Sequence, residues 1–303
     1  MPDWRAGVLL DSHTHIDMRE FDEDRDLVLR RAHESGVAAI IDVGIDIASS
    51  EAAIALAEKY DYVFATVGLH PHDASTITDA VMDRLEELAK HPKVVAIGET
   101  GLDFYRNRSS MEAQFEAFYR QLGLAYKLKL PVVIHSRKAD DAVFDVLDEY
   151  VVKVKAPSFP GDEPECPAQQ KSGGCPGGCA CGGESDSRPV GVLHCFSGDA
   201  ELGRKYIDMG FLISFTGPVT YPKSSAASVA KEIPLDKMLI ETDCPFLTPQ
   251  THRGKRNEPS YVSYVAAKIA EVKGIPVESV AEATSANAIQ LFHLPIKQGV
   301  NRS

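Results

Sequence analysis

Residues 8–17 of the chain read VLLDSHTHID, an apolar run that ends in two histidines separated by one small residue. Alternate residues of a β-strand face the same side, so His13 and His15 can point together toward one face while Ser12 and Thr14 point away. The stretch therefore predicts a buried strand whose carboxyl end carries two imidazoles on one side.

Seven further apolar runs resemble the first, at residues 38–44, 62–68, 94–100, 131–137, 191–197, 211–217 and 238–244. The segments between them have a helical period: Phe115, Phe118 and Leu122 recur at spacings of three and four, as in a helix with one buried face. Apolar strands that alternate with such helices indicate a parallel sheet covered by helices, and eight units close into a barrel. We therefore predict an α/β fold, a (β/α)8 TIM barrel. An open doubly wound sheet is the structural alternative.

The composition is that of a globular protein. With 303 residues and 44% hydrophobic content, the chain can bury a full core. Its formal net charge of -12 opposes loose adhesion to nucleic acid, so a polyanionic substrate needs a local positive site. No apolar run reaches the roughly 18 residues of a membrane span, and residues 1–10 lack the features of a signal peptide. We expect a cytoplasmic protein that does not associate with membranes.

Residues 155–189 interrupt this pattern with a segment rich in Gly, Pro and Ser that contains no apolar run. We expect a single domain over residues 1–303 that this mobile loop interrupts. Because the segment precedes the sixth predicted strand, it should emerge at the barrel face opposite the carboxyl ends of the strands. Its cysteines do not have the paired C-x2-C spacing of common zinc sites, and metal binding or redox linkage is the alternative to a plain loop. They are Cys166, Cys175, Cys179 and Cys181.

Side chains that can bind metal or move protons stand at or just after the ends of most of these runs: His13, His15, His70, His72, Glu99, His135, His194, Glu241 and Asp243. In a barrel the carboxyl ends of the strands converge on one mouth, where barrel enzymes have their active sites. This number of imidazoles and carboxylates exceeds the needs of one four-coordinate ion. We therefore predict two divalent ions, which a shared carboxylate can bridge and which activate a water between them. The alternative is that these groups only hydrogen-bond one another.

Short motifs along almost the whole chain resemble those of the TatD family of metal-dependent deoxyribonucleases, within the wider amidohydrolase-like group. They are DSHTHID (11–17), VGLHPH (67–72), IGETGLDFY (97–105), VIHSR (133–137), HCFSG (194–198), ETDCPFLTP (241–249) and RGKRNEP (253–259). Only residues 155–189 depart from the family pattern. The resemblance implies a (β/α)8 barrel that binds two divalent cations, Mg²⁺, Mn²⁺ or Zn²⁺.

The resemblance also implies roles for individual positions. The first ion has His13 and His15 as ligands, the second has His135 and His194, Glu99 bridges both, and Asp243 completes the first site. Glu99 and Asp243 are the expected catalytic residues, because one carboxylate holds both ions and the other can take a proton from the bound water. Glu241 shares the inward parity of Asp243, and we expect it to orient a ligand or a loop arginine.

Four positions are candidates for substrate binding: His70, Arg137, Arg253 and Arg256. The family counterpart of His70 points toward the substrate, although this histidine could instead only shape its loop. Arg137 lies two residues after a predicted ligand, where a guanidinium can hold a phosphate by two parallel hydrogen bonds or pair with an acid. Arg253 and Arg256 belong to residues 252–259, the densest basic segment of this acidic chain. We expect this segment to contact phosphate; a solvated loop is the alternative.

These residues predict hydrolysis of a phosphodiester, since two dications neutralise the phosphate, supply hydroxide and stabilise the leaving oxygen. The resemblance implies DNA as the substrate, cut from a strand end by a 3'-5' exonuclease. A metal-dependent amidohydrolase of C–N or carboxylic ester bonds is the alternative; in that group the bridging residue is often a modified lysine, where this chain has Glu99. A non-catalytic binding protein would have lost ligands, and none is missing. No phosphate-cradling or dinucleotide glycine motif is present, so we expect no nicotinamide or flavin cofactor.

Overall fold

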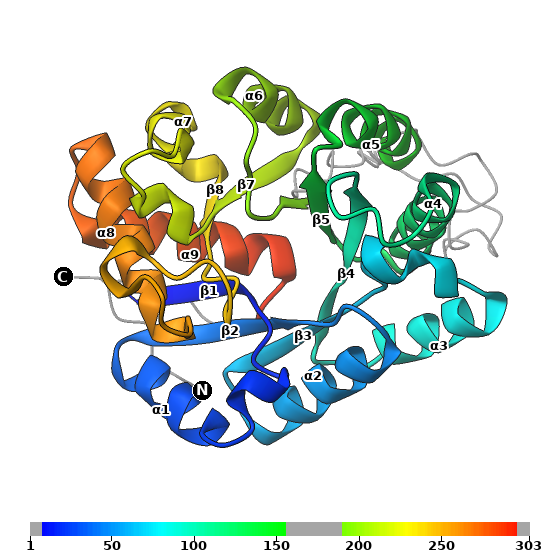
Figure 1. Cartoon of the computed structure of the whole chain (residues 1–303), viewed down its shortest axis with the longest axis horizontal. Helices are drawn as coiled ribbons and strands as arrows, with labels where there is room; N and C mark the ends of the chain where they lie inside the picture. The colour runs from blue at the N-terminus through cyan, green and yellow to red at the C-terminus, as the bar shows by residue number, and fades with distance from the viewer. Residues whose placement is uncertain (1–7, 156–189, 296–303) are drawn as a thin grey trace, which may run out of the picture.

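Eight parallel strands form one sheet in the computed structural model, which describes residues 8–155 and 190–295 (Figure 1). The strands are β1 (Leu9–Thr14), β2 (Val37–Val43), β3 (Val63–Val67), β4 (Val94–Asp103), β5 (Val132–Arg137), β6 (Gly191–Leu193), β7 (Phe211–Phe215) and β8 (Met238–Ile240). Each strand is hydrogen-bonded to the next in chain order. The predicted (β/α)8 TIM barrel is therefore confirmed, and each apolar run predicted from the sequence overlaps a strand.

Helices follow the strands and cover the outside of the sheet (Figure 1). They are α1 (Arg25–Glu34), α2 (Ile47–Lys59), α3 (Asp79–Ala89), α4 (Met111–Leu128), α5 (Asp140–Lys155), α6 (Ala200–Met209), α7 (Ala226–Glu232), α8 (Val262–Lys273) and α9 (Val277–Phe292). None of the helices in the described part of the chain has the length and apolar character of a membrane-spanning segment.

The barrel closes between β8 and β1, at the carboxyl ends of these strands. Thr14 and Cys244 form a parallel bridge there. On either side of it, the His15 backbone N–H donates to the Cys244 carbonyl at 2.8 Å, and the Asp243 N–H donates to the His13 carbonyl at 2.9 Å. Closure of the barrel therefore brings the first and last predicted ligands of the sequence side by side.

Alternating strand residues build two apolar layers. One layer joins the outward-facing residues, such as Leu9, Ile40 and Val132, to the helices around the barrel. The other joins the inward-facing residues, such as Leu10 and Ile41, to Ala288, Leu291 and Phe292 of α9. Burying both faces explains why the strands read as continuous apolar runs.

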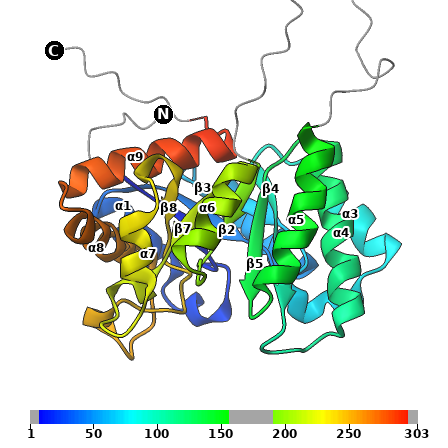
Figure 2. The same ribbon diagram turned by 90° about the horizontal axis from the view of Figure 1, so that it is seen from above.

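Helix α9 closes the amino-terminal end of the barrel. Its Asn287 side-chain amide donates to the carbonyls of Leu235 and Met238, and its Ser285 hydroxyl donates to the Val8 carbonyl. These three acceptors lie at the start of β8 or just before β8 and β1. Figure 2 shows α9 lying across that end of the strands. The opposite end, where the strands finish, is not covered by α9.

The chain leaves the described fold at the end of α5 and re-enters it at Val190, whose N–H donates to the Gly210 carbonyl just before β6. The flanks of the inserted segment thus lie at the amino-terminal ends of the strands, the side opposite the mouth. The mobile loop with four cysteines was predicted over residues 155–189; Lys155 is the last residue of α5, and the rest of the segment lies outside the described residues. The assignment of residues 1–303 to a single domain stays a prediction.

Candidate metal centre

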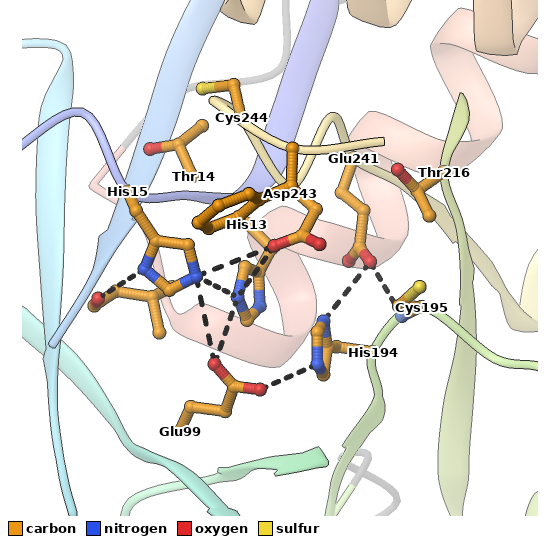
Figure 3. Close-up of polar contacts among 12 residues, drawn as sticks. His13, Thr14, His15, Glu99, His194, Cys195, Thr216, Glu241, Asp243 and Cys244 are labelled. Carbon is orange, nitrogen blue, oxygen red and sulfur yellow. Dashed lines mark hydrogen bonds and ion pairs between the residues drawn. The ribbon is translucent and has the colours of Figure 1, made fainter. Parts of the chain in front are cut away.

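Four donor groups surround one point at the barrel mouth (Figure 3). The Nε2 atoms of His13 and His15 lie 3.3 Å apart. The Glu99 Oε2 atom lies 3.5 Å from His13 Nε2 and 3.8 Å from His15 Nε2. Asp243 Oδ1 lies 3.8 Å and 3.5 Å from the same two nitrogens. Two imidazoles and two carboxylates are thus brought together from β1, the residue directly after it, β4 and the segment after β8.

A second donor group lies on the other side of the same glutamate. Glu99 Oε1 is 2.7 Å from His135 Nδ1 and 2.8 Å from His194 Nε2, and these two nitrogens are 3.3 Å apart. The Nε2 atom of His70 lies 3.5 Å from the same oxygen. Each carboxylate oxygen of Glu99 therefore faces its own set of imidazoles, and the residue is only 3% exposed.

A register irregularity in β1 lets both of its histidines reach the mouth. Between Asp11 and Thr14 the pairing of β1 with β2 shifts, so three steps along β1 match two along β2. The prediction that Ser12 points away was therefore wrong: its hydroxyl lies 3.4 Å from that of Ser214, inside the barrel. Such a bulge re-aims the following side chains, which strict alternation cannot foresee.

The His15 ring is held by β2. Its Nδ1 donates to the Val43 carbonyl at 2.9 Å, which leaves Nε2 free of a proton when the imidazole is neutral. Nε2 is the nitrogen that faces Glu99 and Asp243. The backbone hydrogen bond thus selects the tautomer that can bind a cation at the mouth.

A glycine sets the separation of β4 and β5. Gly101 has a φ of +140°, and a Cβ atom there would collide with the His135 carbonyl oxygen. A larger residue would strain the backbone and push β4 away from β5. Because Glu99 and His135 stand on these two strands, the glycine keeps their side chains within contact distance.

The backbone at Asp243 turns into the left-handed region, with a φ of +56°. Aspartate tolerates this conformation better than most residues. The preceding Thr242 is fixed by Asp11, which accepts from its N–H at 2.9 Å and from its hydroxyl at 2.6 Å. The turn directs the Asp243 carboxylate toward His13 and His15 instead of along the strand.

Glu241 packs behind His194 (Figure 3). Its Oε1 accepts from the Cys195 N–H at 2.6 Å and lies 3.4 Å from His194 Nδ1. Its Oε2 accepts from the Ser214 hydroxyl at 2.6 Å. The contacts of Glu241 are therefore with the ring of a predicted ligand, the first of the two partners expected from the sequence, and not with a loop arginine.

The carboxylates and the imidazoles of this cluster shift one another's pKa values, and the carboxylates favour positive charge beside them. Burial lowers the pKa of His15, but the hydrogen bond and charge of Asp243 and the charge of Glu99 outweigh burial and raise the pKa to about 9. Burial also opposes the charged form of His194, yet Glu99 and Glu241 raise its pKa well above the ordinary value. The pKa of Glu99, despite its burial, is held well below its usual range by the neighbouring histidines.

The donor set fits divalent cations. Imidazole nitrogens and carboxylate oxygens are their usual protein ligands. In the part of the chain that the structure describes, three groups place one ligand atom per residue within 4.8 Å of one another: His13, His15 and Glu99; His70, Glu99 and His135; His13, His194 and Glu241. Glu99 belongs to two of these groups, and its neighbours contribute nitrogens that face the same space.

We expect the metal-free protein to lose stability as the pH rises from about 6.5 to about 9. The pKa of His15 is about 9 in the fold and about 6.5 in an unfolded chain. The contribution of protonated His15 to the free energy of unfolding is thus fully present below pH about 6.5 and is lost as the pH rises through the folded-state pKa. The pKa values of His135 and His194 are also raised and act in the same direction.

Added Mn²⁺ should offset this loss increasingly as the pH rises, because metal ligands must be deprotonated. Thermal unfolding with EDTA or with Mn²⁺ at several pH values measures both trends. A metal-free melting temperature that rises between pH about 6.5 and about 9 would contradict the protonation states assigned to these histidines.

Two of the predicted substrate arginines are exposed and lie over aromatic rings. The Arg137 guanidinium lies 4.3 Å from the centre of the Tyr105 ring, and Arg253 lies 4.4 Å from that of Tyr221. Arg137 is the last residue of β5, and Arg253 belongs to the segment that follows β8. Stacking on a ring orients a guanidinium while its donors stay available.

Arg256 has a different environment. Its two terminal nitrogens each donate to one oxygen of Asp24 at 2.8 Å, and Nη1 also donates to the Glu20 carbonyl at 2.6 Å. Its guanidinium covers the buried Phe21 ring at 4.5 Å. The structure therefore places Arg256 in a network with the segment before α1, apart from the two arginines just described.

Sequence reasoning missed Asp103, the last residue of β4. Its Oδ2 accepts from His72 Nε2 at 2.8 Å and lies 3.4 Å from His135 Nε2. Burial opposes ionisation of Asp103, but the close approach of the His135 ring and the hydrogen bonds from the Arg106 backbone and His72 hold its pKa below the usual range. The sequence could have indicated this residue, because Asp103 stands four residues after Glu99 on the same strand and alternate residues of a strand face the same side.

Comparisons with known proteins agree with this geometry. The profile of a family described as TatD related DNase matches residues 10–293. The metal-dependent hydrolase YabD of Bacillus subtilis (strain 168) is 40% identical, over 95% of this chain and 100% of that protein. The 3'-5' ssDNA/RNA exonuclease TatD of Salmonella typhimurium is 33% identical, over 94% of this chain and 99% of that protein. The crystal structure of YJJV, a TatD homologue from Escherichia coli k12, has a TM-score of 0.80 at 28% identity and covers 96% of this chain and 100% of that chain.

Proposed function

Because this chain belongs to the family of TatD-related DNases, we propose that it is a metal-dependent nuclease that removes nucleotides from the 3' end of single-stranded DNA. The observation that carries the proposal is the position of Glu99, whose two oxygens each face a separate set of imidazoles. A carboxylate shared in this way suits a pair of ions, the usual arrangement for phosphodiester hydrolysis.

We propose that two divalent ions, Mg²⁺, Mn²⁺ or Zn²⁺, share Glu99. The first would be held by His13, His15 and Asp243, and the second by His135 and His194. When bound, such ions neutralise phosphate charge and lower the pKa of a coordinated water toward neutrality. The protein supplies the framework, since Glu99 stands inside β4 and the other residues stand in the last part of a strand or in the segment directly after it.

In this proposal Asp243 would take the proton of the attacking water. Its carboxylate lies beside both histidines of β1, and its side chain is 13% exposed, so it is open to the mouth. Burial opposes its charged form, but hydrogen bonding and charge from His15 and the charge of His13 keep the pKa of Asp243 below the usual range. It is therefore ionised at neutral pH and can accept a proton from the attacking water.

Exposed cations and aromatic rings beside the mouth provide the contacts that an acidic chain needs for nucleic acid. Arg137 and Arg253 can donate paired hydrogen bonds to phosphates. Phe246 is 48% exposed, and its ring centre is 6.3 Å from that of His15, where a terminal base can stack on it. His70 lies against Glu99 and is placed to contact the bound phosphodiester.

Arg253→Ala and Arg256→Ala should have different effects. Loss of a phosphate contact in Arg253→Ala should raise KM for DNA by roughly 10-fold, since hydrogen bonds to charged groups contribute about 1.5–3 kcal/mol. Arg256→Ala removes the pairing with Asp24 and should instead lower unfolding free energy by about 1 kcal/mol. Steady-state kinetics and thermal unfolding of both variants test this. Equal increases in KM with no loss of stability in Arg256→Ala would assign both arginines to the substrate.

The proposed function is tested with metal-loaded protein and 3'- or 5'-labelled single-stranded DNA, duplex DNA and RNA of the same sequence. Exonuclease action from the 3' end releases labelled mononucleotide at once from the 3'-labelled strand and gives a ladder from the 5'-labelled strand. A parallel panel contains an N-acyl amino acid and a lactone. Cleavage of that panel with no turnover of any nucleic acid would overturn the proposal and favour the amidohydrolase alternative.

A further inference from the structure

The Asp103 carboxylate divides its contacts between a loop and two imidazoles. One oxygen, Oδ1, accepts from the backbone N–H groups of Tyr105 at 2.9 Å and Arg106 at 2.7 Å. The other oxygen, Oδ2, faces His72 Nε2 at 2.8 Å and His135 Nε2 at 3.4 Å. The residue is only 1% exposed, so these partners replace its hydration almost completely.

Asp103 is itself fixed by helix α4. Its N–H donates to Gln114 Oε1 at 2.8 Å, and the Gln114 amide donates back to the Asp103 carbonyl at 3.3 Å and to the Ser109 carbonyl at 3.0 Å. Gln114 is fully buried, at 1% exposed. A carboxylate clamped on both its main chain and its side chain can hold another group in place, because it has little freedom of its own.

The two imidazoles that Asp103 contacts belong to, or adjoin, the group of histidines that faces Glu99 Oε1. His135 presents Nδ1 to Glu99 and Nε2 to Asp103, so one carboxylate stands on each side of its ring. His72 reaches the same centre through its backbone, because its N–H donates to His70 Nδ1 at 3.1 Å. The rings of His70 and His135 are in edge contact, with centres 4.6 Å apart.

We propose that Asp103 is a positioning residue that aligns His135 toward the second ion and, through His72, fixes the loop that carries His70. The inference rests on the proposed function in that it assigns His135 to a metal ion. A carboxylate behind a ligating imidazole sets the ring's orientation and tautomer and increases its basicity. Asp103 therefore acts on metal affinity and turnover without contacting the substrate.

Asp103→Asn can keep the contacts of one carboxylate oxygen while it removes those of the other. The asparagine oxygen can still accept from the N–H groups of Tyr105 and Arg106, while its NH₂ cannot accept from an imidazole. We expect the metal-free variant to fold and to unfold at a somewhat lower temperature than the wild type, because His72 Nε2 loses its acceptor. Its affinity for Mn²⁺, measured by titration calorimetry, should fall about 10- to 100-fold, and kcat should fall by a similar factor with KM for DNA unchanged.

Ser109→Ala is the matched control. The Ser109 hydroxyl donates to the His72 carbonyl at 2.8 Å and accepts from the Ser75 N–H at 3.0 Å, so its loss loosens the same loops while sparing the carboxylate–imidazole contacts. It should retain wild-type Mn²⁺ affinity. Wild-type Mn²⁺ affinity in Asp103→Asn, or an equal loss in both variants, would overturn the positioning role.

Failure of this inference is distinguishable from failure of the proposed function. A wild-type protein that binds Mn²⁺ but cleaves no nucleic acid would refute the nuclease activity. The Mn²⁺ titrations of wild type, Asp103→Asn and Ser109→Ala would still decide whether Asp103 supports His135, because they require no substrate.

Discussion

Glu99→Gln should lower the rate of DNA cleavage by at least about 10³-fold. Loss of a single group that stabilises transition-state charge commonly costs about 10²- to 10³-fold, and Glu99 serves two sets of ligands at once. Glutamine has nearly the same size, so the buried site can keep its shape. Its amide, however, presents an NH₂ to one set of imidazoles, and a cation cannot bind there.

The measurement is single-turnover cleavage of 3'-labelled single-stranded DNA, together with calorimetric titration of Mn²⁺. We expect the Glu99→Gln variant to fold and to bind fewer ions than the wild type does. Glu51→Gln is the matched control, because Glu51 is an exposed residue of α2 paired with Arg84 and should leave both readings unchanged. Cleavage within about 10-fold of wild type would remove Glu99 from the centre of the mechanism.

The sequence predicted the strands and the convergence of the ligands because both follow from short-range periodicity. A parallel strand buried on two faces has to be apolar throughout, and a barrel brings all carboxyl ends to one mouth. His13, Glu99 and His194 are distant in the sequence, yet this rule alone predicts that they are neighbours. Strict alternation failed at Ser12, where the bulge in β1 adds a residue that no local pattern marks.

Side-chain partners beyond the strand ends were less accessible to sequence reasoning. Arg256 and Arg253 stand in the same basic segment, and only the fold shows that Arg256 pairs with Asp24, more than two hundred residues away. Asp103 shared the parity of Glu99, but its role depends on the loop of His72 approaching from β3. Loop conformation depends on tertiary contacts, so its partners cannot be derived from periodicity.

Asp243→Asn should reduce kcat by about 10²- to 10⁴-fold, the usual contribution of a positioned general base. The backbone at Asp243 has a φ of +56°, which asparagine also tolerates, so this variant should fold, whereas alanine would add strain to the loss of the carboxylate. The amide oxygen can still face a cation between His13 and His15, but the side chain can no longer accept a proton.

The pH dependence of kcat distinguishes loss of the base from loss of metal. With the base present, the rate should level off once Asp243 and the histidines are deprotonated. With asparagine, the attacking water has to lose its proton to hydroxide in solution, so at saturating Mn²⁺ the rate should rise to a higher pH before it levels off. A variant whose rate is low but levels off at the wild-type pH would show that Asp243 serves as a ligand and that another group takes the proton.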